Sequence, residues 1–292
     1  MNALYGASHV VAKGVMPNFV TPNVFILFRV VGATALFWII KLFLIKEKVD
    51  KTDMLRLAAC GLFGVALNQL FFFNGLNLTS AINSGIIMTL NPIFVVGLSY
   101  FILKEPISKK RAIGITLGAT GAILLTLTAG TGSGDSSLGD LFLFINAVSY
   151  AVYLVLVKPL MVKYKPLTVI TYVFSFGLIY VLIYPPTITE FLNTDFASFT
   201  NEAITKIAYV VLGVTFLTYL LTVYSLKTVS PTVSSAYIYL QPILVIFFAY
   251  TLASIGFADD YTETITGEKI IYMLVIFAGV YITSSTSFVK KT

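Results

Sequence analysis

The chain has 292 residues, of which 58% are hydrophobic and 11% charged, and its mean hydropathy is +0.91. A soluble domain carries about 25% charged residues, so this chain lacks the polar residues needed to cover a water-facing surface. The formal net charge of +6 would suit a nucleic-acid binder, but the basic residues lie in short runs between apolar segments. We therefore expect a polytopic membrane protein with no nucleic-acid partner.

Ten apolar segments approach the length of about 20 residues that a helix needs to cross a bilayer. They lie at about 3–16, 22–45, 54–77, 79–103, 112–129, 138–157, 166–186, 207–226, 231–257 and 270–288. The first segment is short, so we expect its helix to start before Met1. Gly130–Ser137, which is rich in Gly and Ser, is predicted to be a flexible linker between the fifth and sixth segments.

Two stretches of 26 residues repeat each other without gaps at an offset of 150. Leu67–Pro92 and Leu217–Pro242 share seven identical residues, and the amides of Asn91 and Gln241 precede the last proline of each copy. An internal repeat constrains the architecture of the whole fold. It predicts two five-helix units, residues 1–129 and 138–292.

The basic residues indicate how the segments cross the membrane. When the loops are taken alternately, one side holds 15 of the 19 Lys and Arg residues, and the other holds Lys206, Lys269 and nine acidic residues. Basic loops stay in the cytoplasm, so both termini are predicted to be cytoplasmic. Because five is an odd number, the second unit enters the membrane from the opposite side. The predicted fold is an all-α polytopic membrane protein with ten transmembrane helices as two inverted five-helix repeats, which is typical of secondary transporters.

Polar side chains within the spans are candidates for a substrate pathway, because such groups usually face the bundle interior or a wet cavity. Asn91 lies on a serine-bearing stripe of the fourth span, and Gln241 lies on the matching stripe of the ninth. The residues expected near the pathway are His9, Lys13, Asn68, Gln69, Asn91, Tyr153, Tyr219, Tyr237 and Gln241. Helix packing through small residues and amides is the alternative, and Lys13 could also extend to the membrane interface.

Pro92 and Pro242 each remove a backbone donor within a span, which predicts a kink or a broken helix. They are candidate hinges for alternating access, and a static kink is the alternative. Arg29 lies deep in the second span, where it either binds an anionic group or anchors a neighbouring helix. We favour the anchor.

Acidic and metal-binding residues are scarce in the predicted spans. Apart from Asp140, at the start of the sixth segment, no Asp or Glu lies within a span, and His9 is the one group there that titrates near neutrality, so uniport or exchange is favoured over proton coupling. One His and one Cys cannot form a zinc site, and we expect no metal and no cofactor. Gly114, Gly118 and Gly121 indicate close helix packing in the fifth span.

Several short motifs follow one another in the order and spacing of a known family. They are Tyr5–Lys13, Arg29, Asn68–Ala81, Asn91-Pro92, Lys104-Glu105, Gly114, Gly121, Ser230-Pro231, Gln241-Pro242 and Gly279. On these residues the chain resembles, over nearly its whole length, the ten-helix EamA-type transporters of the drug/metabolite transporter superfamily. It departs from their pattern at Tyr5 and Tyr272, which replace a usual Trp and Gly, and in an insertion of about eight residues before Glu263.

The resemblance implies a secondary transporter that exports or exchanges small metabolites, commonly amino acids, across a bacterial inner membrane. The expected partners are a small-molecule substrate and the lipid bilayer, and a monomer would suffice, although an oligomer is possible. A non-transporting scaffold or regulatory subunit is the alternative, and it predicts filled space between the fourth and ninth spans. We expect no enzyme, because the acids that one would need cluster only at Asp259, Asp260 and Glu263.

Overall fold

The computed structural model describes residues 4, 20–78, 87–88, 90–127, 136–240, 243–244, 247, 251 and 267–285. Its elements, with 3-10 and π-helical segments written η, are α2 (Pro22–Leu44), η1 (Lys51–Asp53), α3 (Met54–Gly61), η2 (Leu62–Ala66), α4 (Leu67–Leu78), α6 (Asn91–Leu103), α7 (Lys109–Leu127), α8 (Ser137–Lys163), α9 (Pro166–Ile183), α10 (Pro185–Leu192), η3 (Phe196–Ser198), α11 (Asn201–Tyr209), η4 (Val210–Leu217), α12 (Thr218–Thr228), α13 (Pro231–Ala236), η5 (Tyr237–Leu240) and α15 (Gly267–Ser285).

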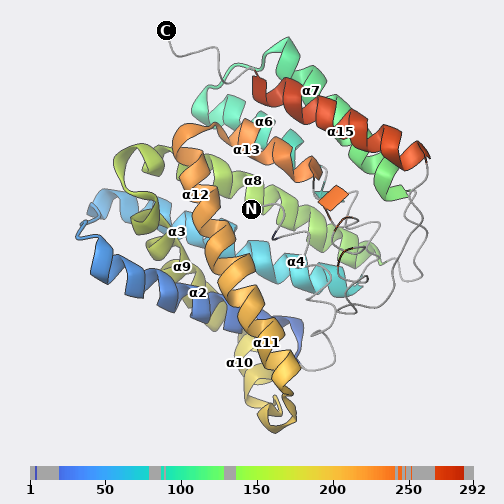
Figure 1. Cartoon of the computed structure of the whole chain (residues 1–292). Helices are drawn as coiled ribbons and strands as arrows, with labels where there is room; N and C mark the ends of the chain where they lie inside the picture. The colour runs from blue at the N-terminus through green and yellow to red at the C-terminus, as the bar shows by residue number, and fades with distance from the viewer. Residues whose placement is uncertain are drawn as a thin grey trace.

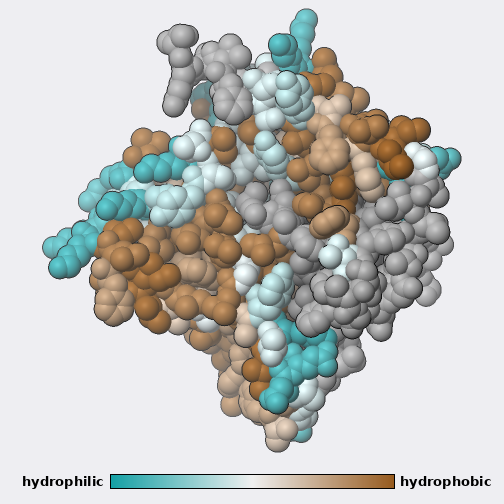
Figure 2. Space-filling view, viewed as in Figure 1, coloured by the Kyte–Doolittle hydropathy of each residue, from teal (hydrophilic) through white to brown (hydrophobic). Residues whose placement is uncertain are grey.

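Within these ranges, six continuous helical segments are long and apolar enough to cross a bilayer. They are Pro22–Leu44, Lys51–Leu78, Ser137–Lys163, Pro166–Ile183, Asn201–Thr228 and Gly267–Ser285. Helix α6 is apolar but shorter. The prediction of an all-α membrane protein is confirmed, and Figure 2 shows the large hydrophobic areas that such a protein presents to lipid.

Some predicted boundaries differ from the observed ones. The seventh span ends at Ile183, and Pro185 starts the separate helix α10, because proline cannot donate the next helical hydrogen bond. Ser137, which was placed in the linker, is the first residue of α8, and the Ser136 hydroxyl caps that helix by accepting from the Gly139 amide. Most of the first span, and parts of the fourth and ninth, lie outside the described residues.

The helices pack in neighbouring pairs. Helix α4 lies against α8, α2 lies against α9, and α7 runs side by side with α15 (Figure 1). The larger apolar core joins α2, the helix from α3 to α4, α8, α9 and α12. A smaller core lies between α7, α15 and η5, where the ring of Tyr239 is buried.

Polar contacts join the loops that the charge pattern assigns to the same side. On the basic side, Lys163 Nζ lies 2.6 Å from Asp53 Oδ2 and also contacts Asp50, which holds the α2–α3 connection against the end of α8. At the opposite end, Asn23 donates to Glu190 at 2.8 Å and accepts from Asn74 at 3.0 Å. These contacts agree with an alternating path of the described helices through the bilayer.

The glycines of α7 let its backbone touch that of α15. A Cβ on Gly279 would lie 2.7 Å from the carbonyl oxygen of Gly114, and a Cβ on Gly121 would lie 3.0 Å from that of Tyr272. Gly118 is covered by the Tyr239 ring and by Gly279. The predicted role of these glycines in close packing is therefore confirmed.

We expect Gly279→Ala to lower the melting temperature in detergent, because the added methyl group meets backbone atoms of α7 that cannot move aside. Overpacking of this kind costs about 1–3 kcal/mol. Gly97→Ala in α6 is the matched control, since a Cβ there meets nothing within 4 Å and Ala is the better helix former. Equal melting temperatures for Gly279→Ala and the parent would contradict the close packing.

Candidate functional site

The third predicted span is not a uniform α-helix. Between α3 and α4 it widens into the π-helical segment η2, Leu62–Ala66, and such segments change which backbone groups find partners within the helix. The carbonyl oxygen of Phe63 accepts a hydrogen bond from Ser149 Oγ of α8 at 2.7 Å. That of Gly64 accepts from Tyr219 Oη of α12 at 3.0 Å. Side chains of two other helices thus bond the backbone of η2.

Asn68 extends this network by one turn. Its backbone carbonyl accepts from Asn146 Nδ2 of α8 at 2.6 Å, and its own side-chain oxygen accepts from Tyr219 Oη at 3.1 Å. Asn146 and Tyr219 are buried. Since an amide or hydroxyl is costly to bury without a partner, these contacts favour the packing interpretation for Asn68 and Tyr219 over the pathway interpretation.

Residues 146–153 of α8 lie between the third span and α6. On one side, the ring of Tyr153 covers Gly64 so closely that a Cβ there would clash with it. On the other side, Asn91 Nδ2 of α6 donates to the carbonyl oxygen of Ala147 at 3.2 Å. The structure therefore brings four of the predicted site residues, Asn68, Asn91, Tyr153 and Tyr219, to a common region centred on α8.

Gln69 lies on another face of the same helix. Its neighbours one turn away are Val65, which packs on Gly177 of α9, and Phe73, whose ring lies 5.5 Å from that of Phe25 in α2. The Gln69 side chain is 2% exposed, and neither its nitrogen nor its oxygen has a hydrogen-bond partner in the structure as described. Asn91 Oδ1 is also buried without a partner there. These amide groups keep hydrogen-bonding capacity that packing does not use.

Arg29 lies next to this face of α4. Its Nε donates to Thr215 Oγ1 of η4 at 2.9 Å, and its guanidinium lies 4.6 Å from the centre of the Phe73 ring. Thr215 in turn donates to the carbonyl oxygen of Val210 at 3.0 Å. Arg29 thereby ties α2 to η4 and α4, as expected of an anchor, and cation–π contact stabilises a desolvated guanidinium.

Other predicted residues have different surroundings. The Tyr237 side chain is exposed, whereas Tyr239, which was not predicted, is buried between α7 and α15. Pro92 lies in the first turn of α6, so the helix that continues from it begins at the predicted break. His9, Lys13, Gln241 and Pro242 lie outside the described residues.

Lys158, one of the basic residues that the charge pattern places in a loop, lies within a helix. It lies in α8, and its Nζ donates to the carbonyl oxygens of Leu226 and Val229, the latter at 2.8 Å, where α12 ends. Nearby, Thr232 Oγ1 of α13 donates to Glu105 at 3.4 Å. These contacts tie α8 and the residues after α6 to the end of α12 and the start of α13. Lys158 directly follows the predicted span 138–157 and is partly buried, and this position at the edge of an apolar segment was the signal that could have indicated it.

Within the described ranges, no group of three or more His, Cys, Asp or Glu residues is arranged to hold a metal ion. The outer acids Asp259, Asp260 and Glu263 lie outside these ranges. The side chains that gather around residues 146–153 of α8 are amides, hydroxyls and aromatic rings.

The chain is similar to known membrane transporters over most of its length. A transporter of Archaeoglobus fulgidus, named as uncharacterized, is 25% identical over 241 residues, which are 82% of this chain and 78% of that protein. The uncharacterized transporter YetK of Bacillus subtilis is 28% identical over 82% of this chain and 74% of its own. One solved crystal structure matches with a TM-score of 0.75 at 17% identity and covers 100% of this chain and 96% of its own, which is a likeness of fold.

The sequence profile of the EamA-like transporter family matches residues 1–127 and again residues 137–285. These two segments take in nearly all the described helices, including every side chain of the network around α8. The chain belongs to the EamA-like transporter family.

Proposed function

We propose that this membrane transporter exports or exchanges small metabolites, such as amino acids, across the bacterial inner membrane by alternating access. Family membership supports transport in general. The proposal goes further in naming a direction, a class of substrate and a mechanism. We place both termini in the cytoplasm, because the basic loops lie on that side.

The observation that carries the proposal is the buried amide of Gln69. Both of its polar atoms are without a partner among the described residues, and leaving such groups unsatisfied costs about 1–3 kcal/mol each. A chain that served only as a scaffold would gain stability from an apolar residue at this position. A transporter retains the amide because the substrate supplies the missing hydrogen bonds.

The chemistry of these amides suits a zwitterionic solute. Gln69 presents both a donor and an acceptor, and Asn91 presents an acceptor beside α8. An amino acid carries an ammonium group and a carboxylate, which are matched by an acceptor and a donor. Of the predicted pathway residues, Gln69 and Asn91 are the two for which we propose direct contact with substrate, with Gln241 as the counterpart of Asn91.

We propose ten transmembrane helices in two inverted units, residues 1–129 and 137–292, with the linker ending at Ser136 because α8 begins at Ser137. The π-helical segments support this arrangement, because Leu62–Ala66 shifted by 150 becomes 212–216, which falls inside η4, Val210–Leu217. The two separate matches to the family profile support it as well. Inverted units form a single pathway between them, so a monomer is sufficient and a small-molecule substrate is the only partner required besides lipid.

The two ends of the bundle supply candidate gates. The basic end is closed by Lys158 and Glu105 at the α12–α13 turn, and Glu190 joins α10 to the start of α2 at the other. Breaking one set of contacts while keeping the other is what alternating access requires. Pro92, at the break before α6, and Pro242 are the proposed hinges.

We expect Gln69→Met to raise the melting temperature by a few degrees and to slow transport about tenfold or more. The substitution keeps the volume of the side chain, removes the unsatisfied amide and takes away its contacts with substrate. The measurement pairs thermal unfolding in detergent with uptake of a pool of labelled amino acids into proteoliposomes.

Asn146→Leu is the matched control, because its amide bonds the Asn68 carbonyl. It should lower the melting temperature, since it removes a hydrogen bond between α8 and the third span and leaves an apolar side chain in its place. A Gln69→Met protein that transports at the parent rate would contradict the proposed contact. No flux from the folded parent protein would move the assignment to a scaffold.

Removing Lys158 should open the basic end. In a Cys60→Ala background, which removes the sole cysteine of the sequence, a cysteine at the buried position Ser234 reports whether water reaches α13. We expect Lys158→Met to make this thiol react several-fold faster with a membrane-impermeant maleimide.

Lys163→Met is the control for this experiment. It removes a lysine from the same helix and the same end, but that lysine contacts Asp50 and Asp53 instead of the α12–α13 turn. Equal labelling rates in both variants would show that Lys158 does not hold the gate.

A further inference from the structure

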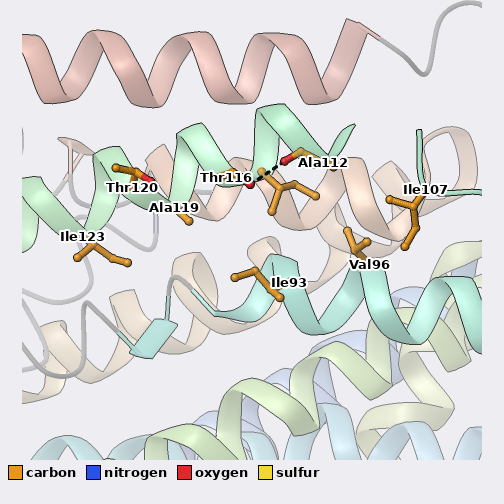
Figure 3. A pocket seen from close by; sticks show the side chains of 9 residues that line it. Ile93, Val96, Ile107, Ala112, Thr116, Ala119, Thr120 and Ile123 are labelled. Carbon is orange, nitrogen blue, oxygen red and sulfur yellow. Dashed lines mark hydrogen bonds between the residues drawn. The ribbon is translucent and has the colours of Figure 1, made fainter. Parts of the chain in front are cut away.

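A groove of about 330 Å³ lies between α6 and α7, away from the network around α8. Ile93 and Val96 of α6 form one wall, α7 from Ala112 to Ile123 forms the other, and Ile107 lies at one end (Figure 3). Thr116 turns its hydroxyl back to the carbonyl oxygen of Ala112 at 3.0 Å, so its methyl group is left for the groove. The lining is therefore largely apolar.

The dimensions of the groove fit a single hydrocarbon chain. At 1.5 Å per residue, the wall from Ala112 to Ile123 is about 16 Å long, which is about half of the 30 Å hydrocarbon core, or one leaflet. A helix of a second copy could also lie along such a groove, so the choice between a lipid and a helix depends on the charges at its end.

The charge at one end of the groove indicates which headgroup the bound hydrocarbon chain carries. Ile107 and Ala112 flank Lys109 and Lys110, which are both exposed and for which the structure as described shows no ion pair. Arg111 beside them pairs with Glu105 at 3.7 Å. Cations in the first turn of a helix repel one another and oppose the helix dipole. An anionic group beside Lys109 and Lys110 relieves both effects.

We propose that the α6–α7 groove binds an anionic phospholipid of the cytoplasmic leaflet. One acyl chain lies along the groove between Val96 and Thr116, and the phosphate of the headgroup lies at Lys109 and Lys110. The site is separate from the proposed substrate contacts at Gln69 and Asn91. The lipid proposal therefore does not depend on which substrate the transporter carries. It gives α6, the helix that begins at the proposed hinge Pro92, a contact with the membrane.

The test is native mass spectrometry of the whole chain in mild detergent, titrated with phosphatidylglycerol or with phosphatidylcholine of the same acyl chains. The parent should retain one phosphatidylglycerol more tightly than phosphatidylcholine. Because each lysine near an anionic surface contributes about a factor of five in affinity, Lys109→Gln with Lys110→Gln should weaken this binding about tenfold or more. Both residues are exposed, so the variant is expected to fold.

Two control pairs separate the groove from general attraction. Lys46→Gln with Lys48→Gln removes the same charge from another exposed connection on the basic side, and it should leave the tight lipid in place. Thr116→Trp fills the groove and should release the lipid with every lysine intact. Ile113→Trp, on an exposed part of α7 outside the groove, should retain it.

Three results would overturn the proposal. They are equal losses in the two lysine pairs, retention of the lipid in Thr116→Trp, and no preference of the parent for phosphatidylglycerol. A dimer of the parent that Thr116→Trp dissociates would assign the groove to a second copy of the chain instead.

Discussion

The hydrogen bonds that α8 and α12 donate to the backbone of the third span organise the centre of this molecule. In hydrocarbon, each backbone carbonyl must find its partner within the protein. Around the π-helical segment η2, two carbonyls accept hydrogen bonds from side chains of other helices, that of Phe63 from Ser149 and that of Gly64 from Tyr219. Three helices are thereby fixed in register at the same depth. The position of Gly64 is also explained, because only a residue without a side chain lets the Tyr153 ring cover it.

This constraint divides the polar residues of the spans into two groups. Asn68, Asn146 and Tyr219 bond the backbone or one another, and such contacts hold helices together in a membrane. Gln69 and the oxygen of Asn91 are buried and receive nothing from the described residues. Polar groups are costly in the membrane interior. Function is therefore expected at a polar group there that does not contribute to packing.

The positions of the described helices could be predicted from the sequence, whereas the residues of the candidate site could be predicted only in part. Hydropathy located the described spans closely, since length and apolarity decide insertion. It missed α10, a short helix that Pro185 separates from α9. Asn68 and Gln69 are adjacent and chemically alike, so composition cannot tell that one bonds Tyr219 and the other does not. That difference depends on which neighbouring helix each side chain faces. The π-helical segment η2 changes these directions, because it rotates the turn after it relative to the turn before it, and no sequence motif indicates that segment.

The cations of the basic side have three different uses, although the positive-inside rule treats them alike. Lys158 lies within α8 and bonds the carbonyls that end α12. Lys163 pairs with Asp53 and fixes a connection. Lys109 and Lys110 are exposed beside an apolar groove. Lys163 is paired with carboxylates, so it contributes little to attraction of the membrane surface, and the Lys158 ammonium donates to carbonyl oxygens within the bundle. Lys109 and Lys110 differ from the other exposed lysines of the basic side, such as Lys46 and Lys48, in lying at the end of an apolar groove. A headgroup bound there can place its acyl chain against the protein, which general attraction to the membrane surface does not provide.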